Sequence, residues 1–252
     1  MKQFLDINGV QTLINNLPGQ GMTNNGNKLG LNDTFYSYLL KQTFATPTVS
    51  TFTLSGTNTS GSKVVGTTVT LTGITHKETN IDNISGNLTL SRNTAAGVSG
   101  TTLSSSITKS SSNSSVSISD TFTATNNGTV TYTLSAPYKD TTGASKTASK
   151  TASITFYWPI YKFASGSTTP SVSDQTYTAA SSVKEEQTIN TTSTTPHVHF
   201  ITTETISNIT SGGFAVPFSS GTLSVTINGC TKTYNTYSIL NCQAGSNIFV
   251  LA

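Results

Sequence analysis

The most constraining feature of this sequence is the alternation of apolar and polar side chains in short runs. In the stretch that holds Val130, Tyr132 and Leu134 every second residue is apolar, and the residues between them are threonines. Successive side chains of a β-strand point to opposite faces, so this pattern predicts strands with one buried and one solvated face. Turn signals such as Asn127-Gly128 separate the runs. The chain is therefore predicted to be all-β, with two sandwich-like modules in tandem.

Residues 44–164 hold the clearest series of alternating runs. Their apolar pairs are Phe52 and Leu54, Val69 and Leu71, Leu88 and Leu90, Val116 and Ile118, and Ile154 and Phe156. About seven short strands at this spacing predict an immunoglobulin-like β-sandwich. Trp158, the only tryptophan, follows the last run. We expect it to pack at the junction with the next module rather than against a ligand.

Residues 165–252 predict a second β module after a connection rich in Ser, Thr and Pro. Expected strands occupy 197–201, 223–227, 234–240 and 248–251, and Asn228-Gly229 is a turn signal between two of them. A chain of 252 residues suits two sandwiches of roughly 100 residues each, preceded by an extension.

That extension, residues 1–43, carries a helical rather than an alternating pattern. Val10, Leu13, Ile14 and Leu17 recur at the spacing of one helix face, and Pro18-Gly19 ends it. Isolated helices below roughly 12 residues are marginal in water, so this piece needs a partner surface. It either folds back on the first sandwich or docks on another protein, and we expect docking. The anchoring residues would be Phe4, Leu5, Ile7, Val10, Leu13, Ile14 and Leu17.

The composition argues against nucleic acid and membrane as partners. Only 9% of residues are charged and there is a single arginine, whereas nucleic-acid binding needs clustered basic side chains. Lys139, Lys146 and Lys150 come closest, and a solvated hairpin explains them. No stretch approaches the roughly 18 apolar residues of a membrane span, and the first residues lack the pattern of a secretory leader. Ser and Thr make up about a third of the chain, so disorder is the rival interpretation, above all at Ser104–Ser115.

Few residues suggest catalysis. Glu185-Glu186 is the only adjacent acidic pair, and neighbours on a strand face opposite sides, so a solvated loop is the better interpretation. Nucleophile-elbow, phosphate-loop and zinc-helix motifs are all missing from the sequence. We expect no enzyme and no cofactor. Cys230 and Cys242, the only cysteines, could form a disulfide, but folding in a cytosol favours two thiols.

His197-Val198-His199 is the one constellation that could hold a metal ion. Residues i and i+2 of a strand share a face, so both imidazoles could point the same way. Around a three-fold axis they would supply six nitrogens, enough for an octahedral transition-metal site. The favoured alternative is a pair of surface histidines after Pro196.

Three stretches of the first module, Gly73–Ile81, Asn127–Leu134 and Ile154–Tyr161, resemble the Ig-like domains of virion proteins of tailed bacteriophages, the crAss-like phages of Bacteroidales among them. Gly212–Phe214, Leu223–Thr226 and Tyr234–Tyr237 follow in an order similar to the C-terminal modules of the same fibre and baseplate proteins. Phe4–Leu13 resembles their N-terminal attachment segments. The resemblance implies a head-fibre, tail-fibre or baseplate role in the virion, with capsid or tail proteins as partners. It also implies a homo-oligomer, often a trimer, and no catalytic residues.

Two other classes of protein remain open. A bacterial surface adhesin or carbohydrate-binding module would need a secretion signal or wall anchor, and a glycan depolymerase would need more acids than the ten present. Exposed Thr, Ser, Asn and Tyr suit weak contacts with host-surface glycans. Many copies on one particle would add such contacts together.

Overall fold

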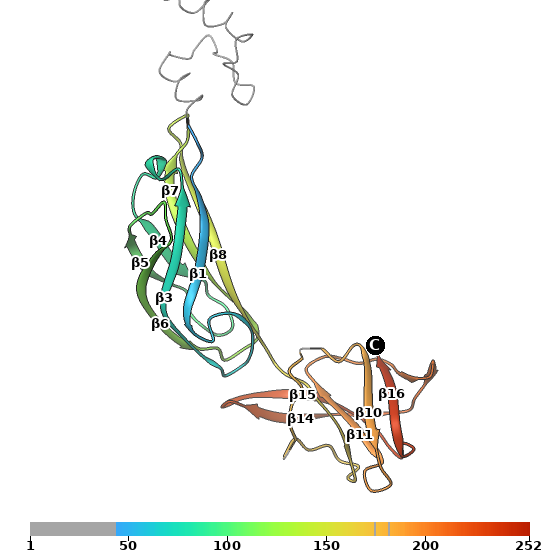
Figure 1. Cartoon of the computed structure of the whole chain (residues 1–252). Helices are drawn as coiled ribbons and strands as arrows, with labels where there is room; N and C mark the ends of the chain where they lie inside the picture. The colour runs from blue at the N-terminus through green and yellow to red at the C-terminus, as the bar shows by residue number, and fades with distance from the viewer. Residues whose placement is uncertain (1–43, 174, 181) are drawn as a thin grey trace, which may run out of the picture.

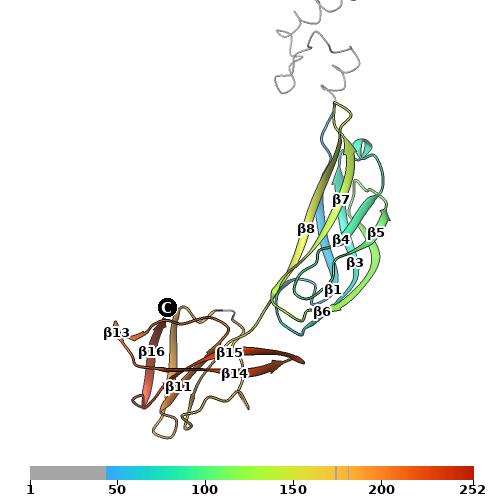
Figure 2. The ribbon, with the colours of Figure 1, turned by 180° about the vertical axis from the view of Figure 1, so that it is seen from behind.

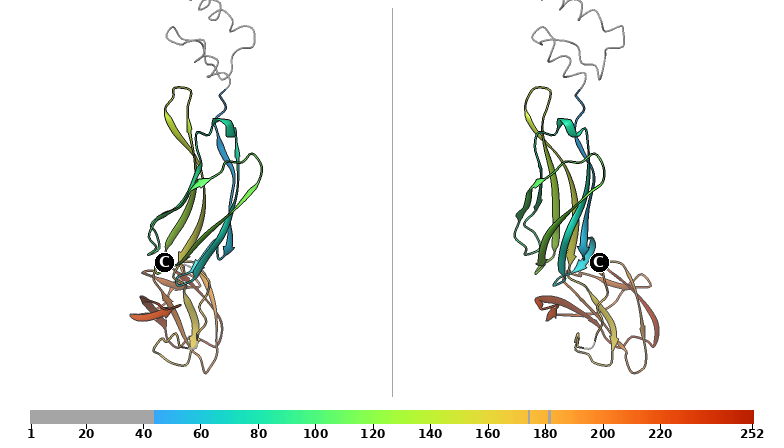
Figure 3. Two further views of the ribbon diagram at one scale, coloured as in Figure 1. Left: turned by 90° about the vertical axis from the view of Figure 1, so that its left-hand side faces the viewer. Right: turned by 60° about the vertical axis from the view of Figure 1, so that its left-hand side comes forward.

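The computed structural model describes residues 44–173, 175–180 and 182–252, which form two β-sandwich modules in tandem (Figure 1). The predicted all-β class is confirmed. The first module is elongated, and the segment that leads into its first strand, blue in the picture, lies at the end that points away from the second module (Figure 3).

The first module is built from eight strands and one turn of 3₁₀ helix, η2 (Ile81–Asn83). One sheet has the order β1-β3-β6 and the other the order β2-β8-β7-β4-β5. Three strands facing a sheet that contains β4, β7 and β8 is the immunoglobulin-like arrangement. The strands are β1 (Thr48–Thr57), β2 (Gly61–Val64), β3 (Thr68–Thr79), β4 (Leu88–Arg92), β5 (Thr101–Ile107), β6 (Ser114–Thr123), β7 (Gly128–Lys139) and β8 (Ser145–Tyr157).

The apolar residues of the alternating runs form the core of the first module, as the sequence predicts. Val130, Tyr132 and Leu134 of β7 are fully buried between the two sheets, and the threonines between them lie on the outer face. β5 and β6 include parts of the serine-rich run 104–115, so the disorder interpretation is wrong for those parts. The β7–β8 hairpin carries the three lysines at Lys139, Lys146 and Lys150, as expected.

The second module is a sandwich of two four-stranded sheets, ordered β14-β15-β11-β9 and β10-β16-β12-β13. Its core holds Val198, Phe200, Tyr237, Ile239 and Phe249. The strands are β9 (Tyr161–Ser165), β10 (Glu186–Thr191), β11 (His197–Thr202), β12 (Ile209–Ser211), β13 (Phe214–Ala215), β14 (Ser219–Ile227), β15 (Cys230–Ile239) and β16 (Gly245–Leu251).

The boundary between the modules lies earlier than the expected division at residue 164. β9 pairs with β11, with Tyr161 opposite Ile201 and Ser165 opposite His197, so it belongs to a sheet of the second module. The expected division placed the apolar residues Ile160 and Tyr161 in the first module. The pairing of β9 with β11, which the sequence does not reveal, assigns these residues to the second module.

The two modules share a packed joint formed by the tip of the β14–β15 hairpin, which lies beneath the lower end of the first module (Figure 2). Asn228 at the tip donates a hydrogen bond from Nδ2 to the carbonyl oxygen of Val65 at 3.1 Å. Trp158 is 5% exposed and packs edge-on against Tyr234, which confirms its expected place. One apolar cluster runs through the joint, including Val64, Val65, Trp158, Ile201, Val225, Ile227 and Tyr234.

Candidate binding site beside strand β14

Three surface hollows meet at the first half of β14. One of about 290 Å³ lies between Ser219–Leu223 and the connection Thr168–Pro170. A second, of about 500 Å³, lies on the other side of the strand, between Ser220–Thr222 and Thr205-Ile206. A third borders Phe218 and Ser219 at the start of the strand. Ser220, Gly221 and Thr222 line both of the first two hollows, so β14 separates one from the other.

β14 leaves this space because it ends its sheet. It pairs along its whole length with β15, and no further described strand pairs with its outer edge. By contrast, β9 and β10 approach one another across the opposite side of the sandwich. Gly221 enlarges the gap: it lies opposite Thr236, and a Cβ at that position would be 3.2 Å from Thr236 Oγ1. The glycine therefore leaves space in the hollow that Thr236 lines, beside Thr168–Pro170.

The lining of the hollows is polar and uncharged. It contains the hydroxyls of Ser219, Ser220, Thr222, Thr236 and Ser238 and the amide of Asn235. None of the residues that line the three hollows is charged. An apolar element adjoins the hydroxyls, because the Phe218 ring packs edge-on against Tyr237 with 5.8 Å between centroids.

A hydrogen bond to His199 fixes the orientation of the Ser238 hydroxyl. Nε2 of His199 lies 2.9 Å from the carbonyl oxygen of Ser167, which can only accept, so Nε2 carries the proton. Nδ1 then has a lone pair and accepts from Ser238 Oγ at 2.8 Å. Burial lowers the pKa of His199, which keeps the ring neutral in this arrangement. Ser238 thus donates inward and keeps its own lone pairs for the hollow that it lines.

The two histidines do share a strand, as the sequence predicts, but they are not surface residues. His199 is fully buried and His197 is 7% exposed, so the surface-histidine interpretation is wrong. Nδ1 of His197 accepts from the backbone N–H of Asn241 at 3.1 Å. Both ring nitrogens of His199 are engaged within the chain, and a metal could bind it only by displacing them. The part of the chain that the structure describes contains no cluster of three or more metal-ligating side chains.

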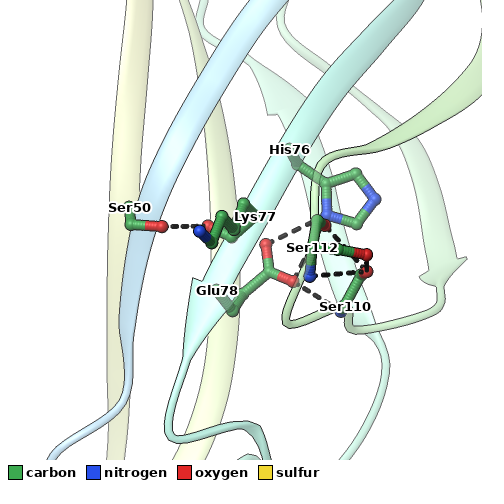
Figure 4. A network of polar contacts seen from close by, with 6 residues as sticks. All are labelled: Ser50, His76, Lys77, Glu78, Ser110 and Ser112. Carbon is green, nitrogen blue, oxygen red and sulfur yellow. Dashed lines mark hydrogen bonds and ion pairs between the residues drawn. The ribbon is translucent and has the colours of Figure 1, made fainter.

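A buried ionisable pair in the first module was not singled out from the sequence. His76 and Glu78 of β3 are 0% and 1% exposed, and His76 Nδ1 donates to Glu78 Oε1 at 3.0 Å. Figure 4 shows both side chains turned toward the loop between β5 and β6, where Ser110 N donates to Glu78 Oε2 at 2.8 Å. The pair attaches this loop to β3. Its sequence signal is spacing, because both residues continue the buried parity of Ile74.

The only arginine also has a structural place. Arg92 of β4 forms an ion pair with Asp120 of β6, and its guanidinium lies over the Phe122 ring at 4.8 Å from the centroid. Tyr132 donates its hydroxyl proton to the same carboxylate at 2.8 Å. Burial, then the bond to Asp120, raises the pKa of Tyr132. This network joins the two sheets across the core.

The remaining candidate residues of the sequence fall as follows. Glu185 and Glu186 are both exposed, as expected, but only Glu185 lies in a loop, because Glu186 begins β10. Cys230 and Cys242 are free thiols that pack against different apolar clusters, and burial raises the pKa of Cys242. The seven anchoring residues lie outside the described part of the chain: Phe4, Leu5, Ile7, Val10, Leu13, Ile14 and Leu17.

Comparisons with known proteins do not assign the chain to a family. No protein-family model matches it, and no curated protein matches it either. Among the described residues, no helix has the length and apolar character needed to cross a membrane.

Proposed function

We propose that this protein is a structural component of a bacteriophage virion, a fibre attached to the head or the tail that displays two β modules. The observation that carries the proposal is the joint. It sets the second module at the end of the first module that lies opposite the start of β1 (Figure 1). The second module carries the polar hollows beside β14. The resemblance of the sequence to Ig-like virion proteins supports the same role.

The packed joint between the two modules suits a fibre in which the first module acts as a spacer. Modules linked by a plain connection move independently unless they share a substantial apolar interface. Here Tyr234 of β15 donates its buried hydroxyl to the carbonyl oxygen of Pro159 at 2.9 Å, and Lys232 lies over the Trp158 ring. Such a spacer holds the distal module at a set distance from its attachment.

The N-terminal segment is proposed to attach the fibre to capsid or tail proteins, with several copies, often three, assembling together. Each copy would then present the same distal surface. Linked weak contacts raise avidity by roughly 10²–10⁴-fold without a stronger single site. A displayed module with only weak contacts could still hold a particle at a host surface.

The proposed virion role can be tested by measuring whether the protein is incorporated into phage particles. Antibody-labelled electron micrographs of purified virions should show the protein at a fixed position on head or tail. Removal of residues 1–43 should abolish its incorporation while residues 44–252 remain folded, as judged by a β-type circular dichroism spectrum. Unlabelled particles would contradict the virion role, and normal incorporation of the shortened chain would contradict the attachment segment.

A second candidate, a bacterial surface adhesin or carbohydrate-binding module, is favoured by the hydroxyl-lined hollows alone. Cell fractionation separates the two. A surface protein would be found in the cell envelope of a bacterium without phage, whereas a virion protein would appear only with particles.

A further inference from the structure

We propose that the hollows on the two sides of Ser219–Thr222 form a binding site for a neutral oligosaccharide. The proposal rests on the proposed function only for its biological setting, since it names what the distal module would contact. The chemistry comes from the lining itself.

The shape of the site suits a small chain of sugar rings. The larger hollow, about 500 Å³, is within the range of roughly 300–1,000 Å³ that small-molecule sites occupy. Because Gly221 has no side chain, no group projects from that position into the hollow beside Thr168–Pro170, on the face that it shares with Thr236. A linear ligand could lie across the strand and contact both sides of it.

The hydrogen-bonding groups match hydroxyls, which both donate and accept. Ser238, which is 4% exposed, can offer only an acceptor, because its proton is directed to Nδ1 of His199. The side chains of Ser220 and Thr222 make no hydrogen bond to other described residues, so both can donate or accept. Asn235 donates from Nδ2 to the Glu204 carbonyl oxygen at 2.9 Å and keeps its Oδ1 as an acceptor. The site therefore offers both acceptors, on Ser238 and Asn235, and free hydroxyls, on Ser220 and Thr222.

An apolar contact complements the polar ones. Phe218 is half-buried at the border of two hollows, and sugar rings offer C–H faces that pack on aromatic rings. The Tyr237 hydroxyl is already used, since it accepts from Ile206 N at 2.9 Å and donates to the Glu204 carbonyl oxygen at 3.3 Å. This leaves the Tyr237 ring as support for Phe218.

The charge of the site selects for neutral ligands. No charged side chain lines the hollows, and the buried His199 behind Ser238 stays uncharged. A carboxylate or phosphate placed there would lose hydration without gaining a cation. Acidic sugars, nucleic acid and phosphorylated ligands are thus disfavoured. With hydroxyl contacts alone, we expect a dissociation constant on the order of millimolar for one site.

The experiment measures binding of the full chain to immobilised hexasaccharides by biolayer interferometry. The neutral probes are glucan, mannan and N-acetylglucosamine hexamers, and the acidic probe is hexagalacturonate. Saturable binding to at least one neutral probe, and tenfold weaker or no binding to the acidic one, is expected. No binding to any neutral hexamer, or equal binding to hexagalacturonate, would overturn the proposal.

Variants locate the site. Gly221→Val adds bulk to the hollow beside Thr168–Pro170, on the face that residue 221 shares with Thr236, at a strand position without positive φ, and we expect at least a tenfold loss of binding. Thr222→Val, a milder change in the same lining, should lose about threefold and serves if the first variant does not fold. Thr233→Val, on an exposed position of β15 outside the hollows, is the matched control and should bind as the parent does. Neutral binding that neither Gly221→Val nor Thr222→Val weakens would place the site elsewhere and overturn the assignment.

The two proposals fail separately. A protein that binds neutral hexamers but is missing from virions would contradict only the virion role. A protein found on virions whose purified chain ignores every neutral hexamer would contradict only the binding site.

Discussion

Cross-strand hydroxyl pairs line the solvent faces of the first module. Thr131 and Ser153 approach to 3.0 Å between Oγ atoms, and Thr68 and Thr123 to 2.9 Å. Pairs of this kind contribute a few tenths of a kcal/mol each, and β-branched threonine fits the pleated surface. They explain how a chain with 9% charged residues can stabilise its sheets largely through uncharged side chains on the outer faces.

At the same residue scale, the buried His76–Glu78 pair should matter more than any surface charge. Glu78→Ala removes the acceptor of both His76 and the Ser110 N–H, and leaves polar groups buried without partners. The loss of one member of a buried pair costs roughly 3–5 kcal/mol, so we expect the midpoint of thermal unfolding to fall by at least several degrees. Glu185→Ala, an exposed acid, is the control and should change the midpoint little. Equal midpoints for both variants would show that the pair is dispensable.

A second residue-scale prediction concerns pH. Burial lowers the pKa of His199 below its unfolded value, so the folded state prefers the neutral ring. Stability from this group is therefore complete above the unfolded pKa of about 6.5 and declines as the pH falls below it, by at most about 1.4 kcal/mol per pH unit. His199→Gln cannot take up this proton. Urea unfolding at pH 7.5 and 5.5 should show a smaller loss on acidification for the variant than for the parent; an equal loss would assign the pH dependence to other groups.

At the scale of elements, the β14–β15 hairpin has two separate roles along its length. Its first half, Ser219–Thr222, is exposed and borders the hollows, whereas Val225 and Ile227 near the tip are buried at the joint. The tip lies close to Gly66, whose φ is +82° and where a Cβ would be 2.4 Å from the Cβ of Asn228. The joint thus depends on a glycine in the other module.

Gly66→Ala tests this dependence. The added methyl group collides with Asn228, so we expect the joint to open and the radius of gyration in small-angle X-ray scattering to change, with a broader distance distribution. Gly143→Ala is the matched control, because Gly143 has a φ of +83° but no atom within 4 Å of its would-be Cβ. It carries the same backbone strain and should leave the scattering curve unchanged. Identical curves for both variants would mean that the hairpin tip does not hold the modules together.

At the scale of the whole molecule, the joint makes the two modules energetically dependent on each other. Separation of the first module exposes Val64, Val65 and Trp158 to water, which costs about 25 cal/mol for each Å² of apolar surface. A chain of residues 44–160 should therefore bind the dye ANS and unfold at a lower temperature than residues 44–252. Equal unfolding temperatures and no dye binding would indicate that the joint contributes little.

Much of this architecture could be predicted from the sequence, and the gaps have physical causes. β10 was missed because two of its three inward residues are polar, Gln187 and Thr191, which removes the apolar alternation. The expected start of β14 at Leu223 was four residues late, since Ser219–Thr222 face solvent on both sides. The alternation of side chains along a strand predicted that His197 and His199 share a face. Their burial could not be predicted in this way, because it depends on segments that pack around them, including Ser167, whose carbonyl oxygen accepts from His199.

The sequence by itself determined the class of fold, the run of the main strands and the place of Trp158, because these depend on local alternation and turn chemistry. Only the tertiary structure decided which strand lies at an open edge, which module β9 joins and which polar side chains become buried. These depend on contacts between residues far apart in the chain, such as Asn228 with Val65. The alternation of apolar and polar residues along the sequence does not reveal such contacts. The candidate site lies on such an edge, so it emerges only from the folded molecule.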